Sequence, residues 1–186
     1  MRLKKVNAVL AILSSLALVV HVSYLSYAMF INYYNEKLNT LMSMPVMVLT
    51  CAHAICGMCS VFMLGDGTRL DIYKKENKQT VIQRITAALI FPMLILHIQC
   101  MEILHGLSAN GVWGGFFLLL FVQILYYAVV LSHVAVSFSK AFITLGLLSS
   151  NDTRKKIDRI AIIFCIVMFV AASYANTLGK IKMMFH

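Results

Sequence analysis

The chain has 186 residues, of which 61% are hydrophobic and only 12% are charged. A soluble domain of this length has too little interior to hide so much apolar surface, which excludes an ordinary soluble enzyme. The formal net charge of +9 could indicate a nucleic-acid-binding protein. The basic residues, however, lie in short clusters between long apolar runs, so we expect an all-α membrane protein that binds no nucleic acid.

Five apolar runs are long enough to cross a bilayer, whose hydrocarbon core needs about 20 apolar residues. In chain order, the predicted transmembrane helices cover about residues 6–31, 43–64, 81–104, 112–148 and 157–178. The fourth helix could instead end near Lys140, and Pro92 predicts a kink in the third rather than a break. Every connection is shorter than a small domain, so residues 1–186 are predicted to form one integral membrane bundle.

Basic residues are distributed unequally between the two sides of this bundle. Thirteen of the 16 Lys and Arg residues lie at the N-terminus, near the second and fourth connections, or in the helix turns beside them: Arg2, Lys4, Lys5, Arg69, Lys74, Lys75, Lys78, Arg84, Lys140, Arg154, Lys155, Lys156 and Arg159. Segments rich in Lys and Arg remain in the cytoplasm. The sequence therefore predicts a cytoplasmic N-terminus and an external C-terminus.

Each of the first four helices carries one deep histidine, a residue that is costly inside a membrane. His21 and His97 lie 15 and 16 residues into helices that rise from the cytoplasm, or about 22–24 Å from that surface. His53 lies about 16 Å from the same surface, and His133 about 10–22 Å, depending on where the fourth helix ends. Depth thus predicts an outer pair, His21 with His97, and an inner pair, His53 with His133.

Two stacked pairs of histidines in a helical bundle are what two haem groups require, with one imidazole on each side of each iron. A single histidine in a helix is more often a packing residue, but one on each of four helices favours ligation. Gly57 and Ser137 each lie one turn from an inner histidine, where small side chains leave room for a flat macrocycle. Lys140 and Arg84 are candidates for neutralising a haem propionate, or they extend to lipid phosphates.

Two short segments resemble the cytochrome b subunit of succinate dehydrogenase and fumarate reductase, in its five-helix, two-haem form. Residues 83–86 read Gln-Arg-Ile-Thr and lead through an apolar run to His97, which is similar to the family's Q-R-[IV]-T-G segment before a haem histidine. Ala87 replaces the glycine of that segment. Residues 53–57 resemble the family's H-A-x-x-G. The fourth helix departs from the pattern, because Val-Ala-Val-Ser follows His133 where the family has Asn-Gly.

The resemblance implies a function for the chain as one subunit of a bacterial cytoplasmic-membrane complex. It implies two haem b groups, a cytoplasmic flavoprotein subunit and an iron–sulfur subunit as partners, and a membrane quinone, expected to be menaquinone, as substrate. The chain has no glycine-rich dinucleotide loop, and its cysteines are not grouped for an iron–sulfur cluster. It is therefore not expected to act on a dicarboxylate by itself.

The quinone site is predicted near the outer surface, where a proton-exchanging group is required. Glu102 is the only acid well within an apolar run, and it is one turn from His105. Five residues turn Glu102 about 140° from the face of His97, so it could instead be a carboxylate that reaches the interface. Glu36, in the first outer connection, is the second candidate.

Two other functions remain open from the sequence. The chain could be the cytochrome b of a different membrane dehydrogenase, with the same haems and another cytoplasmic partner. It could also be a metal transporter, because the segment Met42-x-Met44-x-x-Met47 offers thioether ligands that suit Cu(I). Methionine is equally common as packing material in apolar helices.

Overall fold

The computed structural model of the protein describes residues 2–64 and 74–184. This part of the chain forms five helices: α1 (Arg2–Phe30), α2 (Glu36–Leu64), α3 (Lys74–Ala109), α4 (Trp113–Leu145) and α5 (Asn151–Met184). All five are long and apolar enough to cross a membrane. The prediction of an all-α, multi-pass membrane bundle is therefore confirmed. Arg69, His186 and the side chain of His105 lie outside the described residues.

The helices extend beyond most of the apolar runs that predicted them. α2 begins at Glu36, ahead of the run that starts near residue 43, and α3 continues unbroken through Pro92. α4 ends at Leu145, between the two predicted ends at Lys140 and Leu148. Its end is set by Gly146, whose φ of 78° lies in the left-handed region and whose backbone N–H donates to the carbonyl of Ile143.

The end of α4 removes the uncertainty in the depth of His133. Twelve residues separate His133 from Leu145, which corresponds to about 18 Å along the helix. His53 precedes Leu64, the last residue of α2, by 11 residues, or about 16 Å. The two histidines of the inner pair thus lie at similar distances from the same end of the bundle.

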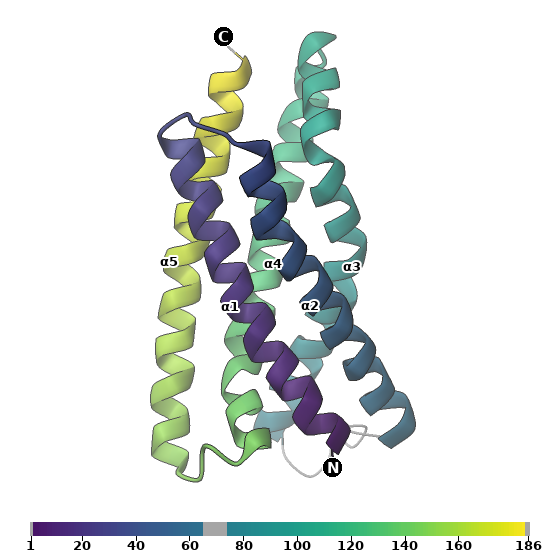
Figure 1. Ribbon diagram of the computed structural model, residues 1–186, viewed down its shortest axis with the longest axis vertical. Helices are drawn as coiled ribbons and strands as arrows, with labels where there is room; N and C mark the ends of the chain where they lie inside the picture. The colour runs from purple at the N-terminus through teal and green to yellow at the C-terminus, as the bar shows by residue number, and fades with distance from the viewer. Residues whose placement is uncertain (1, 65–73, 185–186) are drawn as a thin grey trace.

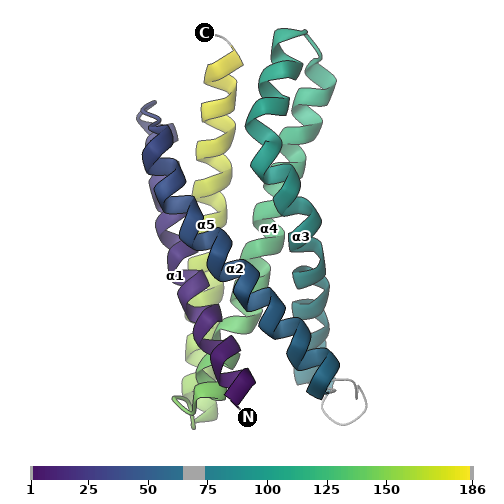
Figure 2. The same ribbon diagram turned by 45° about the vertical axis from the view of Figure 1, so that its right-hand side comes forward.

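Successive helices run in opposite directions (Figure 1). The N-terminus and the α4–α5 connection share one end, which we call the inner end after the orientation that the charges predict. The C-terminus and the α1–α2 and α3–α4 connections share the other, outer end. α1 packs against α2, α4 and α5, while α4 packs against α3, α5 and α1. Among the described residues, α2 packs closely against α1 alone, and Figure 2 shows it crossing α1 obliquely.

Large apolar side chains cover the outside of the bundle, as expected for a surface in contact with lipid. They include Phe62, Phe121 and Ile160, all well exposed in the isolated chain. The largest fully buried side chains are polar instead, namely Gln123 and Ser139. The interior therefore holds a few polar groups among apolar side chains, and one of them, Gln123, belongs to the candidate site.

Candidate functional site

The inner pair brings together imidazoles from two helices that do not pack closely, α2 and α4. The ring centres of His53 and His133 are 6.3 Å apart, and the ring planes are inclined by 65°. Metal–nitrogen bonds to histidine are about 2.0 Å long and the ring centre lies about 1 Å further, so two imidazoles on opposite sides of one ion have centres about 6 Å apart. The spacing of this pair fits a single ion coordinated by both rings.

Main-chain carbonyls orient both inner histidines. Nδ1 of His53 lies 3.2 Å from the carbonyl oxygen of Asn7 on α1, and Nδ1 of His133 lies 3.1 Å from that of Gln83 on α3. A carbonyl oxygen only accepts hydrogen bonds, so each Nδ1 carries the proton and donates it. The other ring nitrogen, Nε2, then keeps its lone pair, and this tautomer is the one that binds a metal through Nε2.

Thr86 is a second neighbour of His133. Its hydroxyl oxygen is 3.0 Å from Nδ1 of His133, and the hydroxyl donates to the carbonyl of Ile82 at 2.8 Å. Because the hydroxyl proton is directed to Ile82, the oxygen of Thr86 can accept from His133. Thr86 belongs to the segment that carried the family resemblance, which gives that segment a physical role next to the inner pair.

The outer pair joins α1 to α3. Among the described residues, these two helices do not pack closely on each other, and no ring contact joins His21 to His97. Nδ1 of His97 donates to Oε1 of Gln123 on α4 at 2.8 Å, and Gln123 is only 1% exposed. Nδ1 of His21 is buried and has no hydrogen-bond partner among the described residues. A buried nitrogen of this kind is costly unless something binds it.

Two tyrosines of α4 pack on the ring of His97. The ring centre of Tyr126 is 4.9 Å from that of His97 with the planes 30° apart, and Tyr127 meets the same ring edge-on at 6.0 Å. Both tyrosines precede His133 on α4 and so lie between the two histidine pairs.

The small residues predicted beside the inner pair leave space in the protein. A Cβ atom added at Gly57 would meet only the side chain of Asn7, at 3.9 Å, which is ordinary contact. Ser137 turns its hydroxyl back to the carbonyl of His133. Neither residue fills the space next to the inner histidines with a large side chain.

Lys140 belongs to the inner site. Its ammonium donates to Oε1 of Gln83 at 3.1 Å and to the hydroxyl of Thr80 at 3.2 Å. Gln83 thus binds Lys140 through its side chain and His133 through its main chain, which joins the cation to the inner pair. Arg84, the next residue of α3, is half-buried at the same end of the bundle.

The predicted quinone residues lie at the outer end and are not brought to the histidines. Glu102 is exposed on α3, and Glu36 is exposed as the first residue of α2. Of the three methionines proposed as thioether ligands, Met44 and Met47 are exposed and Met42 is half-buried. All five cysteines are free, and Cys100 and Cys165 are buried, in keeping with packing thiols.

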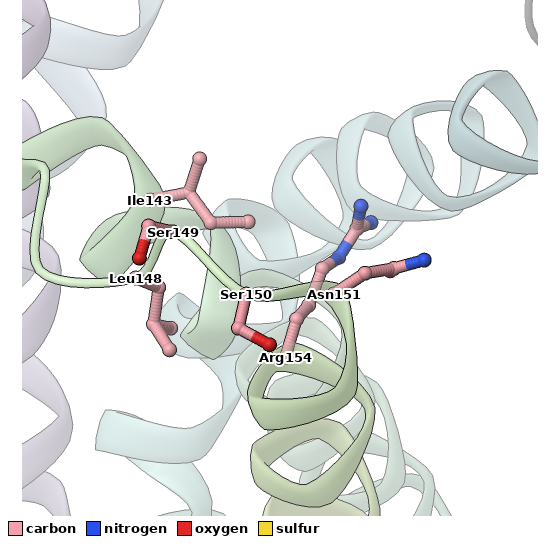
Figure 3. Close-up of a pocket in the computed structure, with 6 residues that line it drawn as sticks. All are labelled: Ile143, Leu148, Ser149, Ser150, Asn151 and Arg154. Atoms are coloured by element: carbon pink, nitrogen blue, oxygen red, sulfur yellow. The ribbon is translucent and has the colours of Figure 1, made fainter.

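One pocket of about 200 Å³ opens at the inner end, where α4 turns into α5 (Figure 3). It is lined by Ile143, Leu148, Ser149, Ser150, Asn151 and Arg154. Arg154 donates to Oε1 of Gln79 at 3.2 Å, and its Nε lies 3.9 Å from a carboxylate oxygen of Asp158. None of the four histidines borders this pocket, so it is separate from the candidate site.

Several residues of the site were not found from the sequence. Asn7 and Gln123 each lie within hydrogen-bond distance of a histidine on another helix, and Lys180 is buried although it stands near a helix end. The signal that could have found Gln123 is its position as an amide within an apolar run. Contacts between helices, in contrast, leave no trace in the spacing along one chain.

No protein-family profile, curated protein or solved structure matches this chain.

Proposed function

We propose that this chain is the di-haem cytochrome b anchor of a succinate:quinone oxidoreductase, that is, of a succinate dehydrogenase or fumarate reductase. In this proposal, His53 and His133 would hold an inner haem b, and His21 and His97 would hold an outer haem b. When bound, the haems supply one-electron transfer between a cytoplasmic iron–sulfur subunit and a membrane quinone.

The inner pair carries the proposal. Its ring centres are 6.3 Å apart with the planes inclined by 65°, and both Nδ1 atoms lie within hydrogen-bond distance of main-chain carbonyls. A histidine that only packs needs one hydrogen-bond partner and no second imidazole opposite it. The same tautomer on both rings, with both Nε2 atoms left to bind, is the arrangement that supports ligation.

The remaining residues have supporting roles in this proposal. Lys140 and Arg84 neutralise the carboxylates of the inner haem, and Gly57 leaves room for its macrocycle. Glu102 or Glu36 exchanges protons with the quinone, expected to be menaquinone, at the outer end. The connections at the inner end, rich in Lys and Arg, face the cytoplasm, where the iron–sulfur and flavoprotein subunits bind.

Absorbance spectroscopy with haem quantification tests the proposal. Protein purified from cells with ample haem should contain two b-type haems per chain, both low-spin and six-coordinate. A colourless protein from such cells would contradict the proposal. One haem per chain would mean that only one of the two proposed sites binds haem.

The enzyme complex is tested separately, by purification in mild detergent. We expect an iron–sulfur subunit and a flavoprotein that oxidises succinate or reduces fumarate to accompany the chain. Recovery of the subunits of another dehydrogenase, with both haems present, would assign the cytochrome to that enzyme instead. The control for charge-dependent docking is a variant with neutral residues at three exposed positions at the start of α5: Lys155, Lys156 and Arg159.

A further inference from the structure

Four side chains in the outer half of the bundle bury a polar atom that has no hydrogen-bond partner among the described residues. They come from three helices: Nδ1 of His21 on α1, Nε2 of Gln123 on α4, and Oγ of Ser173 and Nδ2 of Asn176 on α5. Gln123 is only 1% exposed, and its other polar atom, Oε1, is bonded to His97. A polar group without a partner is costly inside a membrane, where bulk water cannot replace the missing bond.

The contacts of the inner pair place two of these side chains, on α1 and α4, at similar depth. The carbonyl oxygen of Asn7 lies 3.2 Å from Nδ1 of His53, whose ring centre is 6.3 Å from that of His133. Asn7 and His133 therefore lie at about the same level. His21 follows Asn7 by 14 residues, and Gln123 precedes His133 by 10 on a helix that runs the opposite way. The two lie about 21 and 15 Å further toward the outer end, or roughly one helical turn apart.

The contact between α1 and α5 gives the depth of the other two side chains. These helices run parallel and pack on each other (Figure 1), and a Cβ added at Gly179 would lie 2.6 Å from the sulfur of Met29. His21 precedes Met29 by eight residues. Ser173 precedes Gly179 by six residues and Asn176 by three. Relative to His21, Ser173 is therefore displaced by about 3 Å along the helices and Asn176 by about 7.5 Å.

Helix rotation turns these side chains to one side of the contact between α1 and α5. At about 100° per residue, His21 lies about 80° around α1 from Met29. Asn176 and Ser173 lie about 60° and 120° around α5 from Gly179. Because the two helices are parallel and face each other, these rotations lead to the same side. α4, which carries Gln123 and packs on both helices, covers buried atoms there.

We propose that these four side chains surround a cluster of bound water molecules where α1, α4 and α5 meet. Water suits this set of groups, because the amide nitrogens donate, the hydroxyl donates and accepts, and the imidazole nitrogen can do either. A buried water molecule makes about three hydrogen bonds to such groups. Ala172 and Ala175, beside the polar residues of α5, are buried and small.

Bound water would also complete the orientation of the four deep histidines. Nδ1 of His53 and of His133 lies near a main-chain carbonyl, and Nδ1 of His97 lies near the amide oxygen of Gln123. Only His21, among the four, has no such partner in the described part of the chain. Water fills this role whatever the four histidines bind.

Solid-state NMR of the full-length, ¹⁵N-labelled protein in lipid bilayers tests the site by transfer of magnetisation from water protons. We expect the side-chain amides of Gln123 and Asn176 to receive this transfer although both atoms are buried. N176L should reduce the transfer to Gln123 at least about twofold, because each buried water depends on about three partners. The matched control is N110L, at an exposed amide on the outer end of α3, which should leave that transfer unchanged.

A wild-type spectrum without transfer from water to either amide would overturn the proposal. Direct contact between the side chains of Gln123 and His21, with no signal from water, would overturn it as well. Thermal unfolding gives an independent measurement. Leucine in place of a dry, unpartnered amide should raise the unfolding temperature, whereas leucine in place of a hydrated one should lower it, because the water and its other partners lose a bond. A raised temperature in N176L would therefore count against bound water. If N176L does not assemble, the wild-type spectrum decides alone.

Discussion

The inner and outer histidine pairs are oriented by different kinds of group. In the inner pair, the carbonyls of Asn7 and Gln83 accept from the two Nδ1 atoms. In the outer pair, the side chain of Gln123 accepts from His97. A helical carbonyl cannot be removed by substitution, whereas an amide side chain can. Helix packing thus holds the inner rings, and the outer ring of His97 depends on one side chain.

The two pairs also differ in the size of the side chains around them. The rings of Tyr126 and Tyr127 pack on the ring of His97. The inner pair has the small residues Gly57 and Ser137 one helical turn away instead. Axial-ligand orientation and the polarity near a haem both affect its reduction potential. The two sites should therefore differ in potential and in their response to substitution.

Replacing a histidine should have the largest effect and tests the pairing itself. We expect H133A or H53A to remove the inner haem and to spare much of the outer one, because each iron loses an axial ligand only in its own site. H21A or H97A should do the reverse. Haem quantification and low-temperature spectra, which resolve the two haems, provide the measurement.

The pattern of losses can contradict the pairing without contradicting haem binding. If H53A and H97A removed the same haem, the histidines would be paired differently from the 6.3 Å contact between His53 and His133. H105A serves as a control for a histidine outside the four, and it should keep both haems.

Filling the space beside the inner pair should have the next largest effect. We expect G57F to remove most of the inner haem, because its ring would occupy the place of the macrocycle. The chain itself tolerates a Cβ there, since the nearest atom would be 3.9 Å away. G114F, at a glycine with no atom within 4 Å of an added Cβ, is the control and should keep both haems. Full inner-haem occupancy in G57F would place the macrocycle elsewhere.

The helices could be predicted from the sequence because a bilayer demands long apolar runs. The ends of the helices were harder to predict, because a helix continues into the interface where polar residues are tolerated. α2 therefore starts at Glu36, well before its apolar run. Gly146 was a visible stop signal for α4, and it gives the end at Leu145 that the apolar pattern missed.

The four histidines could be identified because ionisable residues are rare in apolar runs, and helix geometry then gives their depth. Their neighbours on other helices could not, because the rotation of each helix and the angles between helices decide which side chains meet. Gln123 lies 26 residues from His97 along the chain yet hydrogen-bonds to it. Lys180 lies near the end of α5 and is buried, which also depends on how the helices pack.

Side-chain and main-chain orientation can be compared by one substitution in each pair. We expect Q123L to weaken binding of the outer haem by about 10–100-fold, the usual cost of removing a group that orients a metal ligand. T86V should weaken the inner haem by less than about tenfold, because the carbonyl of Gln83 still accepts from His133. Haem retention during dilution or competition with an apo-haemoprotein measures both. A larger loss in T86V than in Q123L would reverse the contrast between the pairs.

The smallest effect is expected at the outer rim, with E102Q. The Glu102 carboxylate is exposed and is turned away from the face of His97. Water can replace an exposed proton carrier, so we expect quinol oxidation to fall by less than about tenfold, whereas loss of a buried general acid costs about 100-fold or more. Both haems should keep their spectra and potentials, because the carboxylate is exposed and lies on another face of α3 than His97. E36Q, at the other exposed outer acid, is the matched control.

Unchanged turnover and inhibitor binding in E102Q would rule Glu102 out, and a loss confined to E36Q would move the proton exchange to the start of α2. If neither variant changed quinol oxidation, the quinone would react at the inner end, next to the pair held by the main chain.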